Sequence, residues 1–225
     1  MSNVKVVKIR DAQYPNLLRE IYDPPEELFY DGRLPFDTSP LRPSLGLGEG
    51  KMVEYERGIP LIAVVGSRKM SQRGREYVEL VVPRLVNEGF GIVSGLAYGV
   101  DAWAHEVCLR CGGYALAVLP TPLDKIYPRE NQELAKKIVM SGGCLMTEFE
   151  NGRNVLGSDF LRRNRIVSGL CAGVLVIEAD LRSGSVATAN FALDQGREVW
   201  VCPANPGEPN SEGILKLVED GANLI

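Results

Sequence analysis

Six short apolar runs, separated by segments with helical periodicity, constrain the fold of this chain more than any other feature. The runs are LIAVV (61–65), FGIV (90–93), YALAVL (114–119), CLMTEF (144–149), VLVIEA (174–179) and EVWVC (198–202). Most are continuous rather than alternating, as expected for strands buried on both faces. The intervening segments predict helices over about 71–88, 98–111, 129–141, 160–170, 184–195 and 211–220. This alternation predicts an α/β fold, doubly wound, with a mostly parallel sheet and helices on both faces.

Ligands of such sheets bind beyond the carboxyl ends of the strands, so the loops at that edge are the candidate site. Gly66-Ser67-Arg68 follows the first run and precedes a helix that Ser71 is expected to cap. SGLAYGVD (94–101) repeats the pattern after the second run. Glycine allows close backbone approach, and a helix start offers unpaired N–H groups to an anion. Both turns are therefore candidate anion-binding loops, although an ordinary strand-to-helix turn has the same pattern.

Basic residues gather in the stretch FLRRNRIVSGLC (160–171). Arg162, Arg163 and Arg165 share one helical turn, where their mutual repulsion destabilises the helix unless anions lie nearby. Phe160, just before them, offers a ring on which a nucleobase can stack. We therefore predict a basic pocket that brings these residues together with Arg68 and with the helix start at Ser183-Gly184-Ser185.

Several other chemistries find little support in the sequence. His105, Cys108 and Cys111 form HxxCxxC, but they fall on an apolar helical stripe and lack a second ligand pair, so core packing is the favoured interpretation and no metal is expected. His105 is the only histidine, which disfavours hydrolase triads, and a structural hydrogen bond to Asp101 is expected. Asp124, Glu148 and Glu178 fall at or near strand ends, and they are either acid/base groups or residues that cap helices and pair with the arginines. Neither a dinucleotide fingerprint nor a P-loop is complete.

Composition and the positions of proline and glycine limit how the chain can be organised. The 225 residues carry a net charge of −4, so any nucleic-acid site must be a local concentration of cations. The sequence lacks an apolar run long enough for a membrane span and has no signal core at its N-terminus. Its five cysteines are expected to be reduced, as in a cytoplasmic protein. We expect residues 1–33 to form a short N-terminal segment that packs on the core, 34–60 a Pro/Gly-rich linker or loop, and 61–225 the main domain.

Taken together, these segments resemble the DNA-processing protein A family, also called DprA or Smf. The resemblance covers about 61–222 and, more loosely, the N-terminal YPNLLREIYDPPEELFYDGRL. It is carried by the order and spacing of VVGSRKMSQRG, IVSGLAYGVDAWAH, LDKIYPREN, FLRRNRIVSGL, EADLRSGSVATA and SEGILKLVEDGA. The resemblance implies an extended Rossmann-like domain that binds single-stranded DNA without strong sequence preference.

The family's role then becomes an expectation for this chain. The resemblance implies a cytoplasmic, homodimeric recombination mediator that protects incoming DNA in natural transformation and helps load the RecA recombinase, with no enzymatic activity, cofactor or membrane contact. By position it implies DNA-binding roles for Gly66, Ser67, Arg68, Gly95, Arg163, Asn164 and Arg165, with Arg162 and Phe160 as neighbours. The glycines are expected to let the backbone approach the strand.

Two alternatives use a related scaffold. One is a nucleoside-monophosphate phosphoribohydrolase of the "lysine decarboxylase-like" (LOG) type, which typically carries PGGxGTxxE where this chain has EADLRSGSVATA. The double glycine and the catalytic glutamate are absent from that turn. The other alternative is a sensor of small nucleotides that uses the same pocket. The length of the preferred ligand distinguishes both from a DNA-binding protein.

Overall fold

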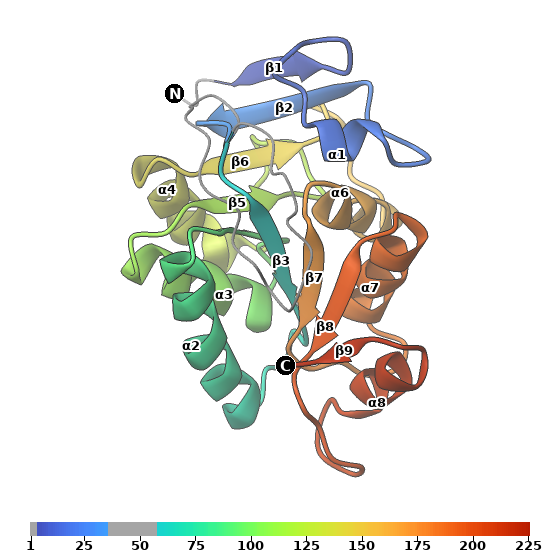
Figure 1. The fold of residues 1–225 in the computed structure, drawn as a ribbon. Coiled ribbons are helices and arrows are strands. Elements are labelled where there is room, and N and C mark those ends of the chain that lie inside the picture. The colour runs from blue at the N-terminus through green and yellow to red at the C-terminus, as the bar shows by residue number, and fades with distance from the viewer. Residues whose placement is uncertain (1–3, 36–57) are drawn as a thin grey trace.

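The structure, a computed structural model, describes residues 4–35 and 58–225. Most of the predicted linker 34–60 therefore lies outside the described residues. The described chain forms one mixed sheet of nine strands with helices on both faces (Figure 1). The strands are β1 (Lys5–Lys8), β2 (Glu27–Gly32), β3 (Leu61–Val65), β4 (Gly91–Ser94), β5 (Ala115–Val118), β6 (Cys144–Thr147), β7 (Gly173–Val176), β8 (Glu198–Val201) and β9 (Asn223–Leu224).

The helices alternate with the strands from β3 onward, as the sequence predicts. They are α1 (Asn16–Arg19), α2 (Gln72–Asn87), α3 (Val100–Arg110), η1 (Arg129–Asn131), α4 (Gln132–Met140), α5 (Asp159–Arg162), α6 (Asn164–Gly169), α7 (Gly184–Asp194) and α8 (Glu212–Glu219). The single helix expected over 160–170 is divided at Arg163 into α5 and α6. None of the helices in the described ranges is long and apolar enough to cross a membrane.

The order of strands across the sheet is β1-β2-β6-β5-β4-β3-β7-β8-β9. All pairings among the seven strands from β6 to β9 in this order are parallel. Strand β2 pairs antiparallel with both β1 and β6. The chain moves outward from β3 through β4, β5 and β6, and then returns to place β7 on the other side of β3. The loops that leave β3 and β7 therefore diverge, and this switch point is where open α/β sheets bind ligands. The predicted fold class is confirmed, with an antiparallel edge added by residues 5–32.

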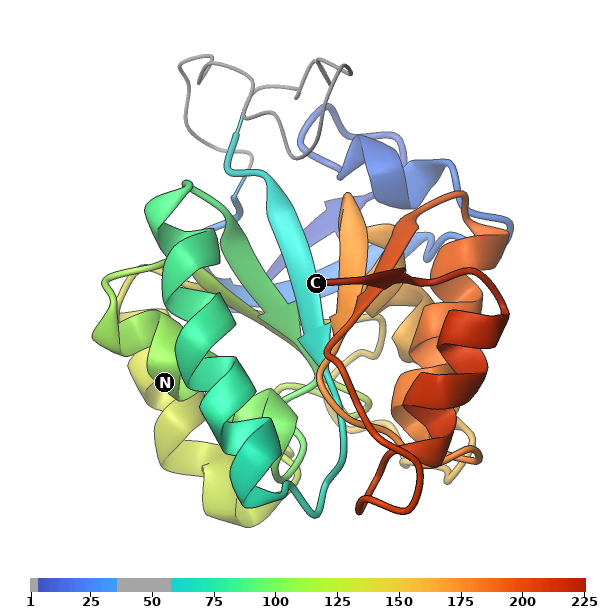
Figure 2. The ribbon, with the colours of Figure 1, turned by 60° about the horizontal axis from the view of Figure 1, so that its bottom comes forward.

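Two apolar clusters pack the faces of the sheet. In β3 all five residues are buried, and successive side chains point to opposite faces. Ile62 and Val64 belong to the cluster under α2, α3 and α4, while Leu61, Ala63 and Val65 belong to the cluster under α6, α7 and α8. Figure 2 shows these two helical layers on either side of the strands. The fully buried central strands explain why the sequence shows continuous apolar runs.

Helix α3 corrects part of the sequence interpretation. Its stripe of Val100, Ala104, Val107 and Cys108 is buried as predicted, but Cys111 at the end of the helix is exposed. The expected Asp101–His105 hydrogen bond does not form: both ring nitrogens of His105 lack a hydrogen-bond partner among the described residues. Burial lowers the pKa of His105 to about 3. Asp101 instead accepts hydrogen bonds from the backbone N–H groups of Gly95 and Ala97, at 3.0 and 3.4 Å.

Candidate functional site

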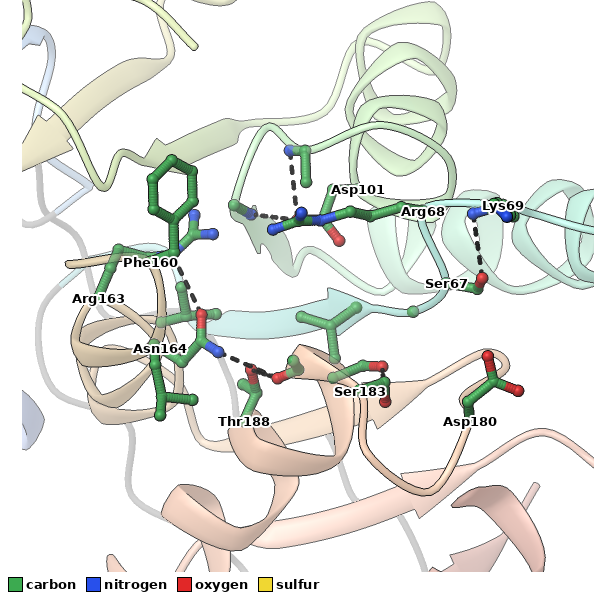
Figure 3. A pocket seen from close by; sticks show the side chains of 18 of the residues that line it. Ser67, Arg68, Lys69, Asp101, Phe160, Arg163, Asn164, Asp180, Ser183 and Thr188 are labelled. Atoms are coloured by element: carbon green, nitrogen blue, oxygen red, sulfur yellow. Dashed lines mark hydrogen bonds between the residues drawn. The ribbon is translucent and has the colours of Figure 1, made fainter. Parts of the chain in front are cut away.

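A cavity of about 490 Å³ lies at the switch point between β3 and β7, beyond the carboxyl ends of these strands. Figure 3 shows side chains from the loops after β3, β4 and β7 and from α5 and α6 converging on it. Its lining includes Gly66, Ser67, Arg68, Lys69, Gly95, Asp101, Phe160, Leu161, Arg163, Asn164, Asp180, Ser183, Gly184, Thr188 and Asn210. The predicted pocket loops therefore do meet at one place in the fold.

The loop after β3 supplies the exposed cations of the cavity. Gly66 has no room for a side chain, since a Cβ there would lie 2.7 Å from Val100 of α3. Ser67 Oγ donates to Asn210 Oδ1 at 3.1 Å and accepts from the backbone N–H of Lys69 at the same distance. These contacts fix the loop and leave the side chains of Arg68 and Lys69 exposed. Neither side chain forms an ion pair with any described residue.

Arg163 forms part of the cavity floor. Its guanidinium donates through Nη1 to the carbonyl oxygen of Val118 and through Nε to Asn164 Oδ1, the latter at 3.2 Å. Burial lowers its pKa to about 10, while the nearby Asp101 carboxylate acts in the opposite direction. A Cβ at Gly95 would lie 2.1 Å from Nη1 of Arg163. Glycine at position 95 therefore accommodates the guanidinium of Arg163, and its close approach to a ligand stays a prediction.

The third wall is the start of α7. Ser183 caps this helix, and its hydroxyl accepts from the backbone N–H of Val186 at 3.2 Å. Asn164 Nδ2 donates to the carbonyl oxygen of Gly184 at 3.0 Å, which ties α6 to the same turn. The positive end of the α7 dipole thus faces the cavity, and such helix starts attract anions.

Phe160 and Leu161 provide the apolar wall. The guanidinium of Arg68 lies over the Phe160 ring, 6.0 Å from its centroid. Leu161 is 53% exposed, so apolar surface faces solvent beside the cations. The start of α5 is held by Arg153, which donates two hydrogen bonds to Asp159 at 2.7 and 3.1 Å. The Arg153 partner also lowers the pKa of Asp159.

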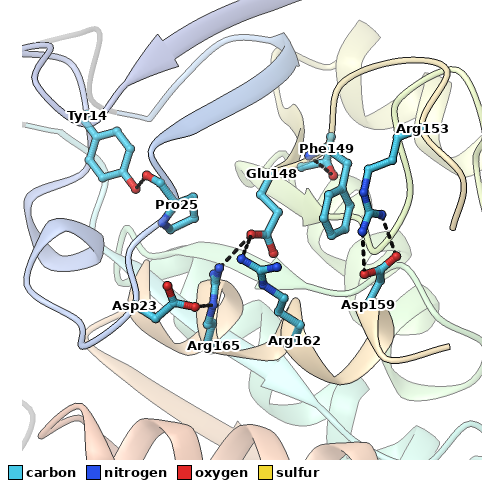
Figure 4. Close-up of polar contacts among 10 residues, drawn as sticks. Tyr14, Asp23, Pro25, Glu148, Phe149, Arg153, Asp159, Arg162 and Arg165 are labelled. Atoms are coloured by element: carbon cyan, nitrogen blue, oxygen red, sulfur yellow. Dashed lines mark hydrogen bonds and ion pairs between the residues drawn. The ribbon is translucent and has the colours of Figure 1, made fainter. Parts of the chain in front are cut away.

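Arg162 and Arg165 lie outside this cavity, in a separate ion cluster (Figure 4). Arg165 Nη2 is 2.7 Å from Glu148 Oε2, and its Nε is 3.0 Å from Asp23 Oδ2. Arg162 Nη2 lies 3.3 Å from the same Glu148 oxygen. Carboxylates of the chain itself thus supply the anions that the arginine cluster needs. Ion pairing was one of the two roles considered for Glu148, and this is the one that the geometry shows.

Glu178, a second carboxylate with two possible roles, is a capping partner. Its oxygens accept from the backbone N–H and the hydroxyl of Ser71 at 2.8 and 2.6 Å. Ser71 in turn caps α2, as predicted, by accepting from the backbone N–H of Gly74. These contacts fix the helix start next to the Arg68 loop.

Some lining residues were not predicted. Lys69 is one of four cations between 66 and 75, and two of the other three have partners. Arg73 pairs with Glu208, and the guanidinium carbon of Arg75 lies 3.8 Å from the centroid of the Trp103 ring. Asn210 adopts a positive φ of 56° and donates from Nδ2 to the carbonyl oxygen of Lys69 at 3.1 Å. Its place at the cavity depends on a contact between residues far apart in the sequence, for which the sequence carried no signal. Among the described residues there is no group of His, Cys, Asp and Glu that could hold a metal ion.

Comparison with known proteins identifies the family. Residues 40–225 match the model of the family described as DNA recombination-mediator protein A. The chain belongs to this family. It is 39% identical to the Smf protein of Synechocystis over 96% of its own length. That match spans 50% of the Synechocystis protein, so the chain corresponds to about half of this relative.

Solved structures of family members have the same fold. The DNA processing protein A (DprA) of Streptococcus pneumoniae superimposes with a TM-score of 0.83 at 38% identity, covering 99% of this chain and 71% of that one. DprA of Helicobacter pylori superimposes with a TM-score of 0.81 at 27% identity, covering 100% and 93%. The latter structure was described for its single-stranded DNA binding mode. The resemblance drawn from the sequence is confirmed, as is the Rossmann-like sheet.

Proposed function

We propose that the cavity at the β3–β7 switch point binds single-stranded DNA, and that this DprA/Smf family member acts as a recombination mediator. The carrying observation is the pair Arg68 and Lys69, which are exposed at the cavity and lack carboxylate partners among the described residues. In a chain of net charge −4, these cations place positive charge at the ligand edge of the sheet, where a nucleic acid would need it.

The walls of the cavity match the two components of a nucleotide. Guanidinium and ammonium groups, together with the start of α7, suit the phosphate groups. The ring of Phe160 and the exposed side chain of Leu161 suit the flat surface of an unpaired base. Stacking of this kind needs bases that are free of a complementary strand, so the site favours single strands over duplex.

The wider role follows from family membership and belongs to the same proposal. We infer that the protein protects incoming single strands in natural transformation, helps load the RecA recombinase, and acts as a homodimer without bond-breaking chemistry. Sedimentation equilibrium of the purified protein tests the dimer. A RecA filament-assembly assay on protein-coated single strands tests the loading activity.

The experiment that tests the site is a binding titration by fluorescence anisotropy. Labelled oligothymidylates of increasing length are titrated at two salt concentrations, with duplex DNA and AMP as competitors. We expect affinity to rise with oligonucleotide length and to fall with salt. The plot of log K against log salt concentration should have a slope of about −0.7 per phosphate contact. Arg68→Ala should weaken binding to all sequences alike. Arg84→Ala, an exposed arginine of α2 outside the cavity, is the matched control.

Two outcomes would contradict the proposal. Binding that ignores salt, or that is the same in Arg68→Ala and Arg84→Ala, would show that the cavity cations do not contact phosphate. Displacement by AMP, without dependence on length beyond one nucleotide, would favour a nucleotide enzyme or sensor instead.

A further inference from the structure

A second cavity, of about 700 Å³, lies on the other side of Phe160. It is formed by the segment that follows β5 and by the loop before α5. Its lining is Thr121, Asp124, Lys125, Ile126, Tyr127, Arg129, Gln132, Val155 and Phe160. Among the described residues, Phe160 is the one that lines both cavities, so the two cavities adjoin at this side chain.

Tyr127 is the other aromatic residue in the lining of the second cavity. Its ring centroid lies 5.3 Å from that of Phe160, and the two planes meet at 84°. Tyr127 is 48% exposed, which leaves part of its ring surface open to another planar group. A strand that extends from the first cavity past Phe160 would therefore bring its next base close to a second aromatic side chain.

The charges of the second cavity also suit a nucleic acid. Lys125 and Arg129 are exposed in its wall, against the single carboxylate of Asp124. Neither Arg129 nor Lys125 forms an ion pair with any residue in the described ranges, and Lys125 Nζ donates a hydrogen bond to the carbonyl oxygen of Arg153 at 3.4 Å. Thr121 is 3% exposed, and its hydroxyl lacks a hydrogen-bond partner in the described part of the chain.

We propose that this second cavity is a further nucleotide subsite, which takes the adjoining nucleotides of the strand bound in the first cavity. A base stacks on Tyr127, and the phosphates beside it contact Arg129 and Lys125. The inference rests on the proposed binding of single-stranded DNA and extends it: the strand crosses the sheet edge over Phe160. Affinity should therefore keep rising with oligonucleotide length after the first cavity is filled.

The test compares Tyr127→Ala with the wild-type protein on oligothymidylates, from a dinucleotide to about a dozen nucleotides. On the longer strands we expect Tyr127→Ala to lower affinity about tenfold, as for the loss of one stacked base. On the shortest strands the two proteins should bind alike. Tyr127→Phe should retain the wild-type affinity, because it keeps the ring. Tyr22→Ala is the matched control, since Tyr22 is fully exposed and lines neither cavity.

A spectroscopic signal reports the stacking itself. Oligothymidylates that carry 2-aminopurine at one position should lose emission on binding the wild-type protein and Tyr127→Phe, and recover part of it with Tyr127→Ala. Arg129→Gln probes the same cavity independently. For long strands, the slope of log K against log salt concentration should be less negative by about 0.7 in Arg129→Gln than in the wild-type protein, because one phosphate contact is lost. This second variant keeps the test decisive if Tyr127→Ala folds poorly.

The outcomes separate this inference from the proposed function. If wild-type protein binds single strands and Arg68→Ala weakens that binding, but Tyr127→Ala and Arg129→Gln match Tyr22→Ala at every length, the second subsite is wrong and the first stands. If wild-type protein binds no oligonucleotide, both proposals are wrong.

Discussion

The loop after β3 at the main cavity and the ion cluster around Glu148 both carry basic side chains, yet the electrostatic environments of these side chains are opposite. In the cluster, Arg165 is 6% exposed and has carboxylate oxygens at 2.7 and 3.0 Å. In the cavity, Arg68 and Lys69 are exposed and have no carboxylate partner among the described residues. A run of arginines therefore indicates a ligand only where the fold leaves the cations without carboxylates of their own.

The largest effect is expected from Arg165→Ala. Removing one partner of a buried ion pair leaves Glu148, itself 7% exposed, without its nearest cation. Such losses lower the free energy of unfolding by about 3–5 kcal/mol. Urea denaturation monitored by circular dichroism measures the change. DNA affinity of the folded variant should stay within about twofold of wild type. A stability loss below about 1 kcal/mol would contradict a structural role for Arg165.

Gly95→Ala tests the cavity side of the comparison. The added Cβ would overlap the Arg163 guanidinium, which hydrogen bonds to Val118 and cannot move freely. We expect overpacking to lower the free energy of unfolding by about 1–3 kcal/mol and to weaken DNA binding. The stability cost should shrink in an Arg163→Ala background, because the clash is then gone. Additive costs in this double-mutant cycle would exclude the contact as the cause.

His105→Leu should change how the free energy of unfolding depends on pH, because His105 is buried without a charge partner, unlike the paired Arg165. The folded-state pKa of about 3 is below the unfolded value of 6.5, so the unfolded chain binds the additional proton as pH falls through 6.5. Stability from this group is complete above pH 6.5 and declines by about 1 kcal/mol between pH 6.5 and 5.5. Urea unfolding at both pH values should show that decline in wild type and not in His105→Leu. Equal declines in the two proteins would show that His105 protonates while folded.

The smallest effect is expected from Arg162→Ala. Arg162 is 51% exposed and lies 3.3 Å from a Glu148 oxygen that Arg165 already contacts. Exposed pairs of this kind contribute about 0–1 kcal/mol. Thermal unfolding and the oligothymidylate titration should both be close to wild type. A loss of DNA affinity as large as that of Arg68→Ala would place Arg162 at the ligand and break the comparison.

The sequence predicted the local features of this fold and of its site. The buried runs form β3 to β8, Ser71 caps the helix that it was expected to cap, and a helix starts at Ser183-Gly184-Ser185 as expected. Strand burial and capping depend on neighbours in sequence, so the sequence carries these signals. The loops carrying Arg68 and Gly95 also met as expected, because parallel strands end at the same edge.

The features that were missed depend on contacts between distant segments. Arg163 and Arg165 are two residues apart, and nothing local indicates that one reaches Val118 while the other reaches Asp23 and Glu148. The packing of Gly95 against Arg163 was missed for the same reason, since the atom that excludes a Cβ belongs to Arg163. Ser67 hydrogen bonds to Asn210, which is 143 residues away in the sequence, so this contact also depends on the tertiary fold.

Strand β2 pairs with β6 and so occupies backbone groups of β6 that would otherwise lie at an open edge of the sheet. A shortened protein that began at residue 40, where the match to the family begins, would present β6 as an open edge strand. Its unpaired backbone N–H and C=O groups would be a template for pairing with other chains, and Arg165 would lose the carboxylate of Asp23. For expression and engineering, residues 5–32 therefore need to stay with the rest of the sheet.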